Sequence, residues 1–413
     1  MRIKARTQPK PRKVKIKCNT KEKQGSIREK SGESIFSIGS LISYLSRIED
    51  TRKPQGIRYS LVTILVVMIL AKLCGEDKPY GIADWAQMRS GWLIETLQLE
   101  HKRLPHHTTY RRILTDVIDG DEFEEIVSEY LGQLPGEGQD VVISMDGKTI
   151  RGTITPEDPF GLHLLAAYLP GEGIVLMQMV VEKDKENEIV VAPKLLKCLD
   201  LRNKIVVGDA MQTQRKLSTQ IVEAEGDYVW IVKDNQPNTR QAIEQLFAPQ
   251  KPVPGLGCPP MNFRTAKTIN KSRGRLEERT ITVSNLLNDY LDWPHLGQVF
   301  KLERRFTYLA SGKVYSETQY GLTSLTDQEA SPERLLEIVR SEWGIENGLH
   351  YRRDVTFQED LTRMTNKSMG RAMAIINNLA ISLLNSLGFD NHARARRFFS
   401  AHPDEAFSAI SGL

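Results

Sequence analysis

The chain has 413 residues and a net charge of +4, with 40% hydrophobic and 26% charged residues. This length suits two or three domains, and the composition is that of a globular protein, neither disordered nor fibrous. The charge is uneven: residues 1–30 hold twelve Lys or Arg and two Glu, so the remainder carries −6. We therefore expect a basic tail over residues 1–32 that forms no core and is disordered when unbound.

Several protein classes are excluded by the sequence. The longest apolar run, Leu61–Ala71, would rise only about 16 Å as a helix, roughly half a bilayer core, so it predicts a buried helix. The N-terminus lacks the pattern of a secretory signal. The four cysteines show no CxxC pairing, which argues against a disulfide framework or a thiolate zinc site. We expect a cytoplasmic protein with no membrane partner.

Helical periodicity fills residues 35–130, which we expect to form an all-helical domain. Helices are predicted over 60–75 and 82–99, and a shorter one is predicted from Thr108, which can cap it. Residues 134–138 have the composition of a linker.

An α/β pattern follows over residues 139–248. Short apolar runs typical of buried strands alternate with helical segments, which predicts a core with a mixed sheet. The predicted strands are 141–145, 162–169, 174–181, 204–208 and 228–232, and the predicted helices are 192–199 and 215–225.

Residues 249–327 interrupt this core as a β-rich insertion. Its predicted strands are 278–283, 299–305 and 315–322. The core resumes over residues 328–395 with a helix that begins at Ser331-Pro332, a capping residue followed by proline at the first helical position.

Two neighbouring predicted strands end in aspartate, at Asp146 and Asp209. The carboxyl end of a strand lies at the sheet edge where α/β proteins place their sites. Two carboxylates that close repel each other, so a hard divalent cation is the natural neutraliser. The alternative is that each is an ordinary turn residue at the end of a strand.

A third carboxylate is expected from the helix that follows the insertion, at Glu346. Its helical neighbours include His350 and Arg353, and an acid beside these residues suits a site that cuts phosphodiesters. The alternative is a solvated, charged helix face. The rival third ligands are Asp354, Glu359 and Asp360.

Other motifs favour structural roles. The His106-His107 pair has no acidic or thiolate residues near it at metal-ligand spacing, so we expect these histidines to be structural or to cap a helix. No GxxxxGK[ST] phosphate loop occurs, so no nucleotide cofactor is expected. Trp230 and Trp343 are expected to pack in the core.

The sequence resembles bacterial insertion-sequence transposases of the DDE superfamily, in the group that contains the H-repeat-associated proteins. The resemblance spans about residues 37–390 and occurs in family order. The matching stretches are Asp146–Gly152, Lys185–Ile189, Gly208–Ala210, Val232–Gln236, Gly344–His350 and Arg353–Asp360.

The resemblance implies a catalytic triad of Asp146, Asp209 and Glu346 on an RNase H-like fold. It further implies two Mg²⁺ ions, with Mn²⁺ able to substitute, that cleave transposon ends and join them to target DNA. The partners would be double-stranded DNA and, on that DNA, a second copy of the chain, with the protein acting on the bacterial nucleoid.

The sequence departs from the family pattern at two places. Gln212-Thr213-Gln214 stands where the family usually has Gly-Cys-Gln, and Glu342 stands where it usually has His. Glu342 adds a negative charge one turn from Glu346, which leaves full activity in question.

DNA contacts are expected from basic and polar residues near the triad and in the helical domain. Residues 78–118 are expected to form a helix-turn-helix-like pair in which Tyr110 and the arginines after it face the groove. The basic tail would add contacts that depend on salt concentration. The candidate contacts are Lys148, Arg151, Lys233, Asn235, His350, Arg353, Arg111 and Arg112, with Arg273, Arg275 and Arg279 as weaker candidates.

Two other functions are compatible with the sequence. One is a catalytically silent relative that only binds DNA through the tail and the helical domain. The other is a stand-alone RNase H-like nuclease, which the helical domain and the insertion disfavour.

Overall fold

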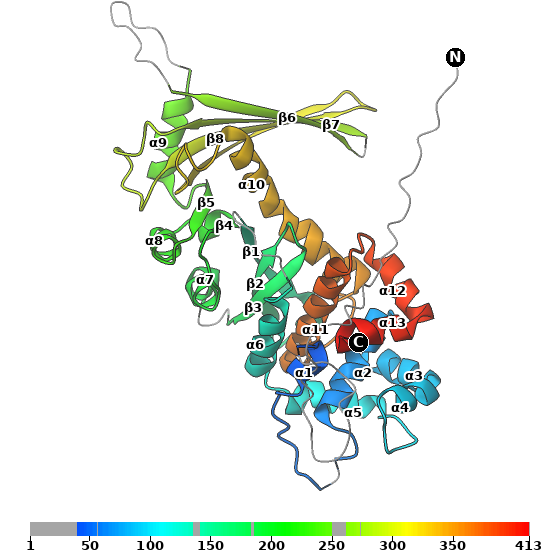
Figure 1. Cartoon of the computed structure of the whole chain (residues 1–413). Helices are drawn as coiled ribbons and strands as arrows, with labels where there is room; N and C mark the ends of the chain where they lie inside the picture. Colours follow the sequence, from blue (N-terminus) through cyan, green and yellow to red (C-terminus); the bar gives the residue numbers. More distant parts are fainter. Residues whose placement is uncertain are drawn as a thin grey trace, which may run out of the picture.

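The computed structural model describes residues 39–412, apart from 56, 135–140, 183–185, 250–261 and 273. The predicted tail of residues 1–32, most of the 134–138 linker and Arg273 lie outside this part of the chain. Figure 1 shows a helical region and an extended sheet, with helix α10 (Pro332–Ile345) running between them.

The helical region combines segments from both ends of the chain in one hydrophobic core. Its N-terminal helices are α1 (Leu41–Leu45), α2 (Leu61–Leu73), α3 (Pro79–Met88), α4 (Ser90–Thr96), α5 (His107–Arg112) and α6 (Gly120–Leu131). Its C-terminal helices are α11 (Lys367–Ser386), α12 (His392–Ala401) and α13 (Pro403–Ser411). The apolar run from Leu61 is indeed a buried helix. Within the described residues, no helix is both long and apolar enough to cross a membrane.

Two helix predictions need correction. The single helix predicted over 82–99 is two helices, because the backbone leaves helical geometry at Arg89. The helix predicted from Thr108 begins one residue earlier, since His106 caps it by accepting a hydrogen bond from the Thr108 N–H. The capping role expected for this histidine pair is thus confirmed for His106.

Over the residues that the structure describes, the sheet has nine strands in the order β3-β2-β1-β4-β5-β9-β8-β7-β6. Strands β1, β4 and β5 run parallel to one another, whereas the remaining neighbours are antiparallel. This is the mixed sheet that the sequence predicts. The strands are β1 (Val141–Ile150), β2 (Leu162–Leu169), β3 (Ile174–Val181), β4 (Lys204–Gly208), β5 (Asp227–Val232), β6 (Arg264–Ser272), β7 (Arg275–Ser284), β8 (Gln298–Tyr308) and β9 (Val314–Thr323).

Helices cover both faces of this sheet. Helices α7 (Glu188–Lys197), α8 (Arg215–Glu223) and α9 (Pro237–Phe247) lie on one face, and α10 and α11 lie on the other. In β4, Val206 joins the core of the first face, while Ile205 and Val207 join the core under α10. Burial on both faces explains why this strand is an unbroken apolar run.

A polar junction joins the sheet to the helical region after α10. The chain leaves α10 through two π-helical turns, η4 (Glu346–His350) and η5 (Arg352–Thr356). Arg353 is completely buried, and its Nε donates to Glu359 at 2.8 Å, while Asn377 donates to the other oxygen of Glu359 at 2.8 Å. Burial opposes ionisation of Glu359, but the charge and hydrogen bond of Arg353 hold its pKa below the usual range.

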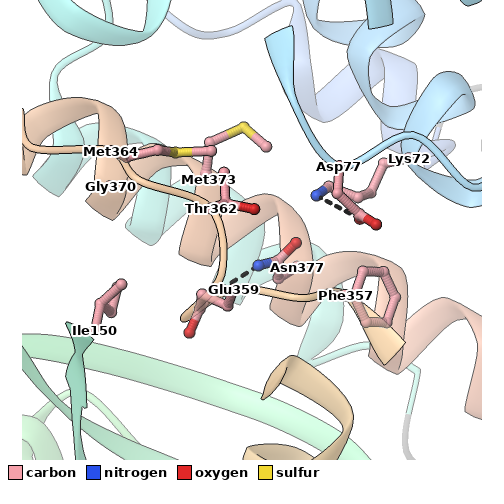
Figure 2. Close-up of a pocket in the computed structure, with 10 residues that line it drawn as sticks. All are labelled: Lys72, Asp77, Ile150, Phe357, Glu359, Thr362, Met364, Gly370, Met373 and Asn377. Atoms are coloured by element: carbon pink, nitrogen blue, oxygen red, sulfur yellow. Dashed lines mark hydrogen bonds and ion pairs between the residues drawn. The ribbon is translucent and has the colours of Figure 1, made fainter. Parts of the chain in front are cut away.

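Figure 2 shows this junction around a small cavity that lies beside Glu359 and Asn377. The cavity measures about 10 Å³, room for roughly one water molecule. The Lys72–Asp77 ion pair, 3.0 Å long, lines its other side. Buried charges therefore occur here in pairs, as their desolvation requires.

The Arg353→Met variant is predicted to lose about 3–5 kcal/mol of unfolding free energy, because it leaves Glu359 charged and unpaired in the interior. The double variant Arg353→Met, Glu359→Gln should recover much of that loss. Denaturant unfolding measures both. A single variant that unfolds like the wild type but binds DNA more weakly would contradict this structural role.

A buried acid in α6 gives the fold a pH dependence. The Glu124 carboxylate is 6% exposed and accepts a hydrogen bond from the Gln178 N–H of β3 at 3.0 Å. Burial raises its pKa to about 7, although that hydrogen bond acts in the opposite direction. From pH 4.5 to pH 7 the folded protein therefore holds a proton that the unfolded chain releases, so stability falls as pH rises through this window.

Glu124→Gln should remove this contribution, which amounts to about 3 kcal/mol across the window. Unfolding free energies of the wild type and the variant, compared at both ends of the window, measure it. Glu125→Gln, an exposed neighbour on the same helix, is the matched control and should keep the wild-type slope. Equal slopes in the wild type and Glu124→Gln would show that Glu124 ionises normally.

Candidate active site

Asp146 and Asp209 lie side by side on adjacent parallel strands. In the pairing of β1 with β4, Met145 is opposite Gly208, so the next residue on each strand is an aspartate, with the strands about 4.8 Å apart. By the alternation of side chains, Asp209 shares a face with Ile205 and Val207, which is the face under α10. The structure thus brings the two aspartates to neighbouring positions on one face of the sheet.

One detail of that expectation is wrong. The strand predicted to end at Asp146 continues to Ile150, because β1 keeps pairing with β2 after its parallel partner β4 has ended. Gly147 then passes close to Glu188 and His163: a Cβ on it would lie 2.1 Å from Glu188 Oε1. A larger residue here would have to displace the Glu188 carboxylate and the His163 ring.

Helix α10 and the following π-helical turn carry three further polar residues on one side, and two of these residues contact β1. The Ser144 hydroxyl of β1 donates to the main-chain oxygen of Glu342 at 3.2 Å. His350 Nε2 lies 3.2 Å from Asp146 Oδ2. Glu346 is exposed and lies between these two residues at intervals of four, so all three share one stripe of the helix.

The electrostatics of this cluster show crowded negative charge. Burial raises the pKa of Asp209, as do the charges of Glu188 and Asp146, against its hydrogen bonds from the N–H groups of Met211 and Gln212. Burial, followed by the charge of Asp209, raises the pKa of Glu342 to about 8. The exposed Lys233 acts in the opposite direction on Glu342.

This donor set has the chemistry that a hard divalent cation requires, since carboxylate oxygens dominate it and their charges oppose one another. Among the described residues, no three His, Cys, Asp or Glu side chains are arranged to hold an ion together as they stand. A third carboxylate would come from Glu346 turned inward or from Glu342.

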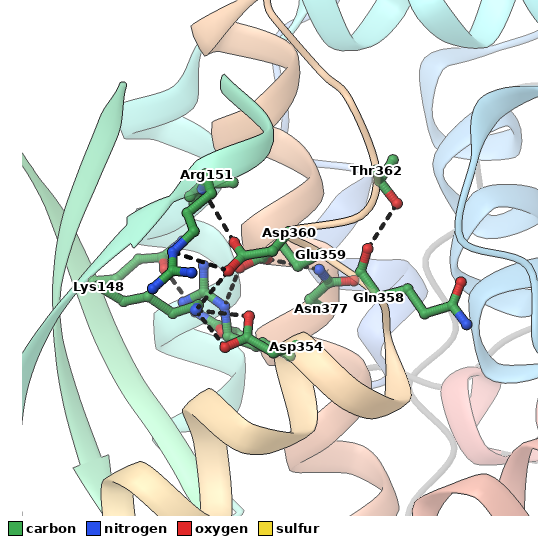
Figure 3. A network of polar contacts seen from close by, with 12 residues as sticks. Lys148, Arg151, Asp354, Gln358, Glu359, Asp360, Thr362 and Asn377 are labelled. Carbon is green, nitrogen blue, oxygen red and sulfur yellow. Dashed lines mark hydrogen bonds and ion pairs between the residues drawn. The ribbon is translucent and has the colours of Figure 1, made fainter. Parts of the chain in front are cut away.

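The rival third ligands, Asp354, Glu359 and Asp360, each form ion pairs with lysine or arginine side chains, in a network that Figure 3 shows. Lys148 Nζ lies 2.7 Å from Asp354 and 3.8 Å from Asp360, and Arg151 Nε lies 3.7 Å from Asp360. Glu359 pairs with Arg353. The network ties β1, just beyond Asp146, to the segment after Glu346.

The predicted DNA contacts fall into different environments. Arg151, Lys233, Arg111 and Arg112 are exposed. Lys148 is largely buried against its acidic partners, and the Asn235 amide donates to the Ala210 carbonyl, next to Asp209. The buried Arg353 and Tyr110 have no path to a DNA groove in this conformation.

Sequence reasoning missed the part played by Glu188. Its two carboxylate oxygens contact His163 Nε2 at 2.8 Å and Gln212 Nε2 at 3.1 Å, and His163 in turn contacts the Thr149 hydroxyl. This chain links β1, β2 and α7 to the turn after Asp209. The Lys185–Ile189 motif was the available signal, but spacing alone gave it no role.

Comparisons with known proteins identify the family of this chain. The Transposase DDE domain model matches residues 137–383, and the DDE_Tnp_1-associated model matches residues 42–131. YncI of Escherichia coli O157:H7 is 29% identical over 84% of this chain and 88% of its own length. The H repeat-associated protein YhhI of E. coli K12 is 26% identical over 84% and 91%. Both carry the word transposase in their names.

Among solved structures, the piggyBac transposase synaptic complex with hairpin DNA aligns with a TM-score of 0.43 and 10% identity, covering 90% of this chain and 78% of that one. At that score, residues cannot be matched between the two. The family model, which spans more than half of the sequence, is decisive. The chain therefore belongs to the family of transposases that carry a DDE domain.

Proposed function

We propose that this chain cuts the ends of a transposable element and joins them to target DNA, using Asp146, Asp209 and Glu346 on an RNase H-like core. The observation that carries the proposal is the pair of aspartates on adjacent strands, beneath the helix that bears Glu346. Family membership and the mixed sheet with helices on both faces support it.

The three carboxylates would hold two Mg²⁺ ions, or Mn²⁺ in their place. The chemistry that such ions supply is Lewis-acid stabilisation of charge on the attacking and leaving oxygens of an in-line displacement. The residues of the chain do the positioning. His350 Nε2 contacts one oxygen of Asp146, the N–H groups of Met211 and Gln212 donate to the Asp209 carboxylate, and Glu188 accepts a hydrogen bond from the Gln212 side chain in the same turn.

The substrate would be double-stranded DNA, bound by two copies of the chain on the bacterial nucleoid. Arg151 and Lys233 are exposed and would contact backbone phosphates. Lys148 would first have to exchange one of its acidic partners for a phosphate. The domain division of the sequence prediction remains part of this proposal: a helical DNA-binding domain, a catalytic core and a β-rich insertion.

Asp146→Asn, Asp209→Asn and Glu346→Gln are each predicted to nearly abolish Mg²⁺-dependent cleavage while leaving DNA binding largely intact. Each change keeps the shape of the side chain and removes a charge that the ions require. Cleavage of duplexes made from the DNA flanking the gene measures this. Glu337→Gln, an exposed glutamate on the same helix, is the control and should cut normally.

The second candidate, a silent DNA-binding relative, is favoured by Glu342, which stands where the family usually has histidine. It predicts binding without cleavage by the wild type. If Glu342→Gln rather than Glu346→Gln stops cleavage, the helix contributes its carboxylate from one turn earlier, and the triad assignment is wrong at its third position.

The exposed arginines of α5 are proposed to contact the transposon end. Arg111→Ala with Arg112→Ala should weaken binding to end sequence more than to random DNA, because base contacts carry the specificity. Both side chains are exposed, whereas Tyr110 beside them is buried and anchors the helix. An equal loss of affinity for both DNAs would show that the arginines contact only phosphates.

A further inference from the structure

Gln212 is a buried polar residue at a position where the family usually has glycine. It ends the 3₁₀ turn η3 (Ala210–Gln212), which Asp209 caps by accepting hydrogen bonds from the N–H groups of Met211 at 2.9 Å and Gln212 at 3.4 Å. The Gln212 Nε2 donates to Glu188 at 3.1 Å, whereas its Oε1 is buried without a hydrogen-bond partner among the described residues. Half of a buried amide left unpaired is costly, so the other half is expected to have a role.

Two glycines leave room for the side chains of Gln212 and Glu188 at the point where β1 and β4 part. A Cβ on Gly208 would lie 3.1 Å from Gln212 Cγ, and a Cβ on Gly147 would lie 2.1 Å from Glu188 Oε1. The residues two positions before these glycines belong to the core under α7. Because side chains alternate along a strand, Gln212 and Glu188 lie on the face of the sheet opposite α10 and leave the face of the aspartates open.

From Glu188 the contacts return to β1. Glu188 Oε1 lies 2.8 Å from His163 Nε2, and His163 Nδ1 lies 2.8 Å from the Thr149 hydroxyl. Thr149 is on the same strand as Asp146, three residues further on. The side chains of His163 and Glu188 are only 10% and 13% exposed, so water competes little for these contacts. We call the contacts of Gln212, Glu188, His163 and Thr149 the Gln212 bridge.

We propose that Gln212 is a positioning residue: by donating to Glu188 it ties the turn that holds Asp209 to the strand that carries Asp146, and so fixes the spacing of the two carboxylates. The proposal rests on the proposed function for the metal ions. It adds that this chain positions its aspartates through a contact that a glycine at position 212 cannot make.

The variant Gln212→Met tests this role, because methionine keeps the length of the side chain but cannot donate to Glu188. Binding of Mn²⁺ to the full chain without DNA, followed by electron paramagnetic resonance, should weaken about 10-fold, as is usual when a hydrogen bond behind a metal ligand is removed. Glutamine and methionine are both uncharged, so a loss of affinity reports the position of the carboxylates and not the charge of the site.

Gln220→Met is the matched control. The Gln220 amide also donates to α7, at the Pro193 carbonyl 2.9 Å away, but it is no part of the Gln212 bridge. This variant should bind Mn²⁺ like the wild type. Denaturant unfolding of both variants measures the stability that each loses, and a loss of Mn²⁺ affinity in Gln220→Met as large as in Gln212→Met would overturn the proposal.

A double variant tests whether the two central residues act as one bridge. Glu188→Ala should weaken Mn²⁺ binding at least as much as Gln212→Met, because it removes the acceptor of the bridge. Adding Gln212→Met to Glu188→Ala should then cause no further loss, since residues that act through one contact are not additive. Additive losses would show that the two residues act separately and would overturn the proposal.

Hydrogen–deuterium exchange in EDTA tests the bridge without any metal. The N–H groups of Met211 and Gln212, which Asp209 holds, should exchange faster in Gln212→Met and at the wild-type rate in Gln220→Met. Unchanged exchange in Gln212→Met would overturn the proposal, and so would faster exchange with unchanged Mn²⁺ affinity, because the bridge would then only stabilise the turn. A wild type that binds no Mn²⁺ would overturn the proposed function, and faster exchange in Gln212→Met would then still show that the bridge holds the turn.

Discussion

The repulsion between Asp146 and Asp209 is the constraint on which the rest of the site depends. Parallel pairing of β1 with β4 forces the two side chains together on the face under α10. The surroundings compensate only in part, through the N–H groups after Asp209 and the contact of His350 with Asp146. Burial raises the pKa of Asp209, and the charges of Glu188 and Asp146 raise it further. We propose that added positive charge, from metal ions, completes this site.

Helix α10 connects the carboxylate cluster to the outer strands of the sheet. One stripe, continued from α10 into η4, carries Glu342 and Glu346. The next stripe carries Trp343, which is half exposed and not in the core as predicted, and whose ring centroid lies 5.0 Å from the Arg304 guanidinium of β8. Close contacts fix its position, since a Cβ on Gly344 would lie 2.5 Å from the Cβ atom of Pro170, the residue after β2. The ion pair of Lys148 with Asp354 holds the segment that follows.

Much of the sheet could be predicted from the sequence, because strands buried on both faces are mostly apolar, as in β2, β3 and β4. Strand β6 was missed because it is a polar edge strand in which only Ala266 is a buried hydrophobic residue. The two aspartates were found for the same reason as their strands. The partners of Lys148 and the exposure of Trp343 could not be predicted, since they depend on contacts between segments distant in sequence.

Binding of Mn²⁺ to the full chain, followed by electron paramagnetic resonance without DNA, tests the central claim most directly. We predict that the wild type binds the ion and that Asp146→Asn and Asp209→Asn each greatly weaken binding, while Glu337→Gln does not. Unchanged Mn²⁺ binding in both aspartate variants would contradict the account, because the paired carboxylates would then not be the metal site.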